Sequence, residues 1–244
     1  MIKNVIYICL LALALGSCEQ KDSFLYEEKA GLYFYVPDVR DGETVDPNAL
    51  VKEVDFAFRK TGEWNLMWYC ETFYGDSLKA DTLRLVVSLI GKVSDQPREY
   101  NLKAVAVDGE LPMTELQFQN PYILKANALS DTALVIIPRP QQRGEYAVAI
   151  TFNDSENFDG IVSERNEYRL FISDRYPEPV GWDSYTYGEY SEEKYAFWVT
   201  VLGITYDYRW YMYDNGLGSL IAALEEYNAT HPDAPKDFTF PGMN

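Results

Sequence analysis

The sequence has few of the residues from which catalytic and metal sites are usually built. Its 244 residues include three cysteines and one histidine. Cys9 and Cys18 lie in or beside the N-terminal leader, so Cys70 is the only thiol in the body of the chain. A single thiol forms neither an internal disulfide nor a cysteine zinc site. We expect Cys70 to be buried and unreactive, and His231, which no Gly-x-Ser-x-Gly motif accompanies, to be a solvated helix-end residue.

Positive charge and long apolar runs are also scarce. The chain has 21 Lys and Arg against 38 Asp and Glu, a formal net charge of −17. Phosphate backbones and anionic head groups repel such a chain, which argues against nucleic-acid binding. The apolar stretch from Val5 to Leu15 is far shorter than the roughly 20 residues that span a bilayer, and no later stretch approaches that length. We therefore expect no transmembrane helix.

The first residues follow the plan of a signal peptide. Lys3 precedes the apolar stretch, and two small residues stand before Cys18. The sequence Leu15-Gly16-Ser17-Cys18 resembles the bacterial lipobox, in which a peptidase cuts before a cysteine that has received diacylglycerol. We expect residues 1–17 to be removed, Cys18 to carry lipid, and residues 18–29 to form a polar tether. Two or three acyl chains, at about 0.8 kcal/mol per buried methylene, give lasting membrane attachment. An ordinary secretory signal with an incidental cysteine is the alternative.

Residues 30–175 predict a mainly β unit. Short apolar runs alternate with period two and are separated by turn residues. Because no helical pattern lies between them, seven or eight strands indicate an immunoglobulin-like antiparallel β-sandwich. The strands are expected at 31–36, 54–58, 81–90, 98–107, 132–137, 144–152 and 167–172.

Two prolines in Tyr176-Pro177-Glu178-Pro179 indicate a boundary, and residues 176–244 predict a smaller, partly helical, aromatic-rich region. Ser191 is expected to cap a helix that runs through Leu202 and stops at Gly203. Ser219 is expected to cap a second helix. The segment between the two helices, 204–213, fits a strand or a helix.

Aromatic side chains concentrate in this C-terminal region, which is the candidate location of a ligand site. Flat rings stack on sugar faces, and nearby carboxylates bind sugar hydroxyls. The candidate ligand-binding residues are Trp182, Tyr185, Tyr187, Trp210, Tyr211 and Asp214. The sequence favours the other interpretation, that the rings only pack the helices against the sandwich. Exposed rings would favour binding, and buried rings would favour the packing role.

One turn is a candidate calcium site. Residues 153–160 concentrate oxygen donors, which calcium accepts, and the candidate ligands are Asp154, Asn157 and Asp159. Their spacing is not that of an EF-hand, and Asn and Asp also suit any tight turn. No other cofactor is expected, and no residue is assigned a catalytic role.

Further motifs occur in order along the chain: Leu32-Tyr33-Phe34, the segment 89–98, Asn157-Phe158, Trp182 and the segment 187–194. Together with the lipobox they resemble a family of Bacteroidetes outer-membrane lipoproteins described only as a domain of unknown function. The turn Asp95-Gln96-Pro97 departs from the Asp-Arg-Pro expected there. The resemblance implies a lipoprotein encoded near starch-utilisation-type uptake systems, beside glycan-capturing and TonB-dependent proteins, and it implies no established activity. Glu19 and Asp22 are similar to the acidic signal that directs such lipoproteins to the cell exterior.

These observations lead us to expect a non-enzymatic lipoprotein on the outer membrane, exposed at the cell surface. It would be an accessory of glycan uptake that binds glycan or a neighbouring outer-membrane component. A structural or adhesive spacer without a small-molecule ligand is the first alternative. A glycoside hydrolase is the second, because 38 carboxylates include many pairs, but sequence cannot place two of them across a glycosidic bond.

Overall fold

The computed structural model describes residues 30–36, 47–66, 70–109, 111–158, 165–207 and 215–241. The predicted leader, Cys18 and the tether 18–29 lie outside these ranges. In the described part of the chain, no helix has the length and apolar character needed to cross a bilayer.

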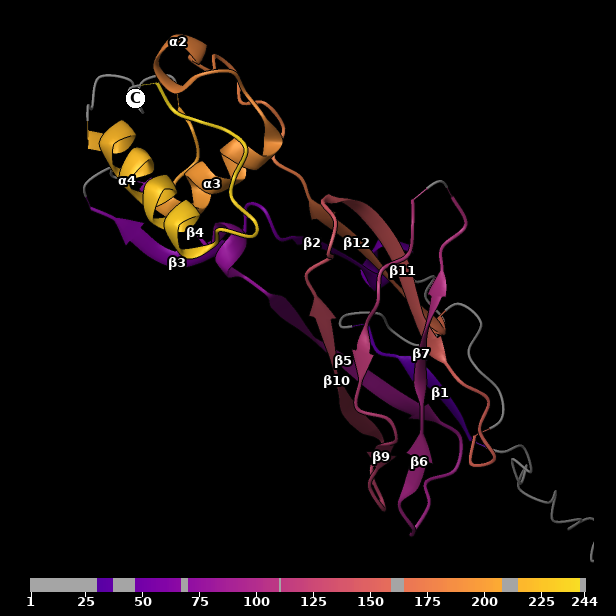
Figure 1. The fold of residues 1–244 in the computed structure, drawn as a ribbon. Coiled ribbons are helices and arrows are strands. Elements are labelled where there is room, and N and C mark those ends of the chain that lie inside the picture. Colours follow the sequence, from indigo (N-terminus) through magenta and orange to yellow (C-terminus); the bar gives the residue numbers. More distant parts are fainter. Residues whose placement is uncertain are drawn as a thin grey trace, which may run out of the picture.

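Two four-stranded sheets form a sandwich (Figure 1). Sheet A has the order β1 (Gly31–Phe34), β5 (Ala80–Ile90), β10 (Ser130–Pro138) and β8 (Gln117–Phe118). Sheet B has the order β2 (Val51–Asp55), β12 (Glu167–Asp174), β11 (Gly144–Phe152) and β7 (Leu102–Ala106). The 3-10 turn η1 (Pro47–Leu50) leads into β2, and β6 (Arg98–Tyr100) pairs with β9 (Tyr122–Leu124) in a separate ribbon. Neighbours in both sheets are antiparallel except β2 and β12, which run parallel. The predicted immunoglobulin-like sandwich is confirmed.

Period-two alternation explains why these segments are strands. In β5, Leu83, Leu85, Val87 and Leu89 are buried, whereas the residues between them mostly face solvent. Between the sheets, the Phe34 and Phe152 rings stack with centroids 4.6 Å apart. Burial of each large apolar side chain contributes about 1.5–3 kcal/mol to the free energy of folding. The apolar layer between the sheets therefore provides most of the stability of the sandwich.

A second unit with its own core lies at one end of the sandwich (Figure 1). Its helices are α2 (Ser184–Tyr187), α3 (Glu192–Leu202) and α4 (Asn215–Thr230). The second unit also includes a hairpin of β3 (Lys60–Asn65) and β4 (Cys70–Phe73). The 3-10 turn η2 (Gly75–Ser77) follows this hairpin. Phe58 and Phe73 pack against the second core, and the Phe73 amide donates to the Gly203 carbonyl (2.8 Å). The unit therefore combines the predicted region 176–244 with a stretch that the sequence had assigned to 30–175.

The predicted helix ends are right for α3 and wrong for α4. The Ser191 hydroxyl accepts from the Lys194 amide (3.1 Å), and Gly203 ends α3 in the left-handed conformation at φ 68°. By contrast, α4 begins at Asn215, so Ser219 lies inside the helix and does not cap it. Packing of Gly216 and Leu217 against the second unit outweighs the low helix propensity of glycine there.

Two strand predictions also need correction. The predicted strand 98–107 is β6 and β7, interrupted at Asn101. Next to the break, the Asn120 side-chain amide binds the Leu102 backbone in both directions, accepting at 2.9 Å and donating at 2.8 Å, in the place of a neighbouring strand. The predicted strand 54–58 is β2 at Val51–Asp55, and the next three residues cross to the second unit.

Candidate functional site

The structure brings two of the predicted ligand-binding residues together inside the second core. Trp182 and Tyr187 have ring centroids 5.8 Å apart, and further rings surround them: Tyr190, Tyr195, Trp198 and Tyr206. Tyr187 is only 3% exposed, and the half-buried Trp182 donates its indole N–H to the Gly188 carbonyl at 2.9 Å. Tyr187 thus belongs to the buried second core, and Trp182 packs against it.

The other predicted ligand residues do not join this cluster as described. Tyr185 is 93% exposed on α2 and lies apart from the buried rings. Its neighbour Asp183 caps α2, because its carboxylate accepts from the Tyr185 and Thr186 amides at 3.1 and 3.2 Å. The predicted residues Trp210, Tyr211 and Asp214 lie outside the described residues.

The candidate calcium turn is only partly described. Asp154 and Asn157 are exposed, and the Asn157 side chain donates to the Glu99 carbonyl at 3.1 Å. Asp159 lies outside the described residues. Within the described ranges, no three His, Cys, Asp or Glu side chains lie together as metal ligands would. Calcium at this turn stays a prediction.

The two residues that are chemically distinctive by type are placed as follows. Cys70 is half-buried in β4 rather than fully buried, and burial together with the charge of Glu71 raises the pKa of its thiol. His231 directly follows α4 and is exposed as predicted, with its ring stacked on Tyr227 at 4.2 Å.

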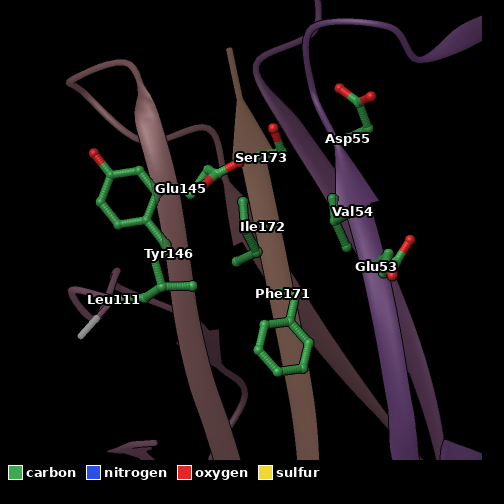
Figure 2. A pocket seen from close by; sticks show the side chains of 9 residues that line it. All are labelled: Glu53, Val54, Asp55, Leu111, Glu145, Tyr146, Phe171, Ile172 and Ser173. Carbon is green, nitrogen blue, oxygen red and sulfur yellow. The ribbon is translucent and has the colours of Figure 1, made fainter. Parts of the chain in front are cut away.

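A groove on sheet B is a candidate site in the described structure. It has a volume of about 360 Å³, within the usual range for ligand pockets, and lies over the ends of three strands (Figure 2). Its lining residues are Glu53, Val54, Asp55, Leu111, Glu145, Tyr146, Phe171, Ile172 and Ser173.

Strand register explains how these side chains meet. Ser173 of β12 lies opposite Asp55 of β2 and Glu145 of β11. Two residues earlier, Phe171 lies opposite Glu53. Alternate residues of a strand share one face, and neighbouring strands lie about 4.8 Å apart, so the two rows stand side by side on the outer face of sheet B. Figure 2 shows the Phe171 ring in the centre, with Glu53 on one side and Leu111 on the other.

The groove is acidic with an apolar floor. Phe171 and Leu111 are 38% and 39% exposed, and none of the nine lining residues is basic. Asp55 uses one carboxylate oxygen to accept from the Phe58 amide at 2.9 Å. Arg175 is a basic residue that senses the charge of Glu145. Its pKa is raised mainly by the hydrogen bond and charge of Glu192 and to a smaller extent by the charge of Glu145. The groove thus offers a ring face surrounded by carboxylate and hydroxyl oxygens.

Comparison with known proteins places the chain in a family. The family model described as a domain of unknown function, DUF4843, matches residues 54–204, more than half of the chain. The chain belongs to this family. The DUF4843 match includes β11, β12 and α3, and therefore most of the groove and part of the second core.

Among solved structures, the chain is similar to the apo form of the Calx CBD1 domain, with 10% identity and a TM-score of 0.32, over 60% of this chain and 98% of that one. It is also similar to WR4, a C. elegans member of the MSP family, with 8% identity and a TM-score of 0.24, over 51% of this chain and 91% of that one. No curated protein matches the sequence.

Sequence reasoning missed the groove of this DUF4843 member, although one signal was present. In the segment 167–172, Leu170 and Ile172 alternate with Phe171, so the buried pair assigns Phe171 to the outer face. A single aromatic residue in a strand is a weaker sign of a binding site than the many aromatic residues of the C-terminal region. The neighbours Glu53 and Glu145 come from strands far apart in the sequence, and only the register of sheet B brings them to it.

Proposed function

We propose that this DUF4843 protein is a non-enzymatic lipoprotein, anchored to the outer membrane through lipid on Cys18 and exposed at the cell surface. It serves there as an accessory of glycan uptake, in contact with glycan or with a neighbouring component such as a TonB-dependent protein. The lipobox Leu15-Gly16-Ser17-Cys18 supports the anchor, and the resemblance to Bacteroidetes lipoproteins supports the setting.

The observation that carries the binding part of this proposal is the exposed Phe171 ring, which lies beside Glu53 in a groove that Asp55 and Glu145 also line. A sugar that stacks on this ring leaves its hydroxyls at the edge, where Glu53 and Glu145 accept hydrogen bonds and Ser173 accepts or donates. The groove is shallow, which suits one or two sugar units of a longer chain. This site takes the place of Trp182 and Tyr187, whose rings pack the second core.

A structural or adhesive spacer is the second candidate function. The observation that favours it is the burial of the aromatic cluster, because those rings strengthen the second unit and leave a smaller exposed aromatic surface. A spacer requires a rigid, stable fold and does not require a ligand.

Glycan arrays and pull-downs from envelope extracts, made with the soluble chain 19–244, distinguish these functions. We expect Phe171→Ala to weaken glycan binding roughly tenfold or more, the loss of about 1.4 kcal/mol. Tyr185→Ala, which removes the exposed ring of the originally predicted site, serves as the control and leaves binding unchanged. Loss of binding in Tyr185→Ala alone would move the site to α2. Absence of both a glycan and an envelope partner would contradict the proposal and favour the spacer.

A further inference from the structure

A cluster of charged side chains lies between the two cores. Its centre is Arg139, which follows β10 and is 10% exposed as a side chain. Its guanidinium donates to both oxygens of Asp174 at 2.9 and 2.6 Å, the bidentate geometry that makes Arg–carboxylate pairs strong. It also lies 2.8 Å from an Asp76 oxygen and donates to the Gly75 carbonyl at 2.8 Å. One side chain of the sandwich thereby holds η2 and the end of β12.

A second arginine extends the cluster to α3. Arg143, in the same loop between β10 and β11, donates to Asp76 at 2.7 Å and lies 3.4 Å from Glu193 of α3. Its guanidinium carbon lies 4.9 Å from the centre of the Tyr176 ring, which is fully buried in the second core. Lys236, in the segment after α4, pairs with Glu193 as well.

The cluster is balanced in charge although the chain is strongly acidic. Three cations, Arg139, Arg143 and Lys236, face three carboxylates, Asp76, Asp174 and Glu193. Asp174 is only 3% exposed as a side chain, so loss of one arginine leaves a carboxylate buried without its full set of partners. Arg139 and Asp174 are the buried pair of the cluster, whereas Asp76 and Glu193 are partly exposed. The buried pair favours one placement of the two units, because sliding would separate charges that lie out of contact with water.

Three chain segments connect the two units (Figure 1). They are the residues after β2, the residues between η2 and β5, and the residues after β12. On the first, the Phe58 ring contacts Phe73, Tyr176 and Tyr195 of the second unit. On the third, the Tyr176 amide donates to Glu192 of α3 at 2.8 Å. The cluster contacts two of these segments, because Arg139 donates to the Leu78 carbonyl at 3.3 Å and to the Tyr176 hydroxyl at 3.2 Å.

We propose that the Arg139–Arg143 cluster is a joint that locks the sandwich and the second unit into one cooperative body. The second unit is then not an independent domain but part of a single rigid molecule. The joint also fixes the strand ends that line the groove, because Ser173 directly precedes Asp174 and Glu145 follows Arg143 by two residues. Rigidity of the joint holds whether or not the groove binds glycan.

The distribution of tryptophan allows a direct test. All five tryptophans lie at positions 64, 68, 182, 198 and 210, and the sandwich strands contain none. Among the described tryptophans, Trp182 and Trp198 lie in the second core and Trp64 lies in β3, whereas Trp68 and Trp210 lie outside the described residues. Trp182 and Trp198 make fluorescence sensitive to the second unit, whereas far-UV circular dichroism near 218 nm is dominated by the sandwich. In urea unfolding of the full soluble chain, we expect the two signals to change together in the unaltered protein.

Weakening the joint should separate the two signals. Arg139→Met keeps the side-chain stem but removes the charge, and Asp76→Asn is a milder change in η2. In both we expect the fluorescence midpoint to fall below the dichroism midpoint, by roughly 1 M urea in Arg139→Met. Arg169→Met removes an arginine that pairs with Glu167 on the sandwich surface and should leave the signals coincident.

Two results would overturn the proposal. One is separate transitions in the unaltered protein. The other is coincident transitions in the joint variants, and Asp76→Asn decides this point if Arg139→Met fails to fold. Amide hydrogen exchange provides a local readout: in Asp76→Asn, peptides that cover 144–150 and 168–174 should exchange faster, while a peptide that covers 81–89 in sheet A should not.

Discussion

At the residue scale, Gly75 shows how closely η2 and α3 approach each other. Its φ is +54°, and a β-carbon built there would lie 2.6 Å from the Thr200 hydroxyl and 2.7–2.8 Å from the Thr200 backbone. The next amide, of Asp76, donates to the same hydroxyl at 2.8 Å. Only glycine fits both the backbone conformation and this contact.

We therefore expect Gly75→Ala to lower the free energy of unfolding by about 2–4 kcal/mol, the sum of backbone strain and displacement of α3. Gly62→Ala is the matched control, because its φ is +84° but no atom lies within 4 Å of its added carbon. It should cost only about 1 kcal/mol. Urea unfolding measures both variants, and equal losses would show that contact with Thr200 is unimportant.

Asp76 gives the joint a dependence on pH. Burial raises its pKa, but the hydrogen bond and charge of Arg143 and the charge of Arg139 outweigh burial and hold the pKa below its ordinary value. A carboxyl with a lowered pKa in the folded state contributes stability that is present above the ordinary value of about 3.9 and disappears as the pH falls through the lower, folded-state value.

Between pH 5 and pH 2.5, the unaltered protein should consequently lose more stability than Asp76→Asn. The difference between the fluorescence midpoints of the two proteins, measured in urea at each pH, isolates Asp76 from the other carboxylates. Parallel loss in both proteins would mean that this side chain does not titrate with folding.

At the element scale, helix α3 is specified by its ends. Ser191 caps the first turn, Glu192 and Glu193 lie near the positive end of the helix dipole, and Gly203 terminates the helix. Ser191→Ala should lower the free energy of unfolding by about 1 kcal/mol, whereas Ser191→Asp retains a capping oxygen and should be close to neutral. Thermal unfolding of both variants checks this. An equal effect of the two substitutions would show that the capping oxygen of residue 191 does not stabilise the protein.

The elements that sequence predicts well are those whose signals are local. β5 and β11 are apolar runs bounded by turn residues, α3 has clear caps, and the predicted limits of all three differ from the observed ones by at most one residue. The hairpin β3–β4 was missed because its residues are largely polar or exposed and lack an apolar alternation. The start of α4 was misplaced because packing of Gly216 and Leu217, rather than a capping residue, extends it toward Asn215.

The candidate site was less predictable for a physical reason. An aromatic-rich segment indicates rings but not whether they are buried. Tyr185 and Tyr187 are two residues apart, yet Tyr185 is exposed and Tyr187 is buried. Phe171 becomes a candidate only when the parallel pairing of β2 with β12 places Glu53 beside it. Contacts between strands more than 100 residues apart have no local signature.

At the scale of the whole molecule, the fold has two distinct poles. β5 runs from η2, beside the second unit, to Ile90, and Gly31 pairs with Ile90. The chain therefore enters the sandwich at the pole opposite the second unit (Figure 1). Eleven residues at about 3.4 Å each make β5 nearly 40 Å long. A lipid on Cys18 would hold the entry pole near the membrane and present the groove and the second unit away from it.

The proposed anchoring at the outer membrane depends on that lipid. Mass spectrometry of the N-terminal peptide from membranes of producing cells measures it directly. We predict that the mature chain begins at Cys18 and carries acyl chains, and that Cys18→Ala leaves an uncut leader without lipid. A mature chain with an unmodified Cys18 thiol, or a native protein that keeps residues 1–17, would contradict the account.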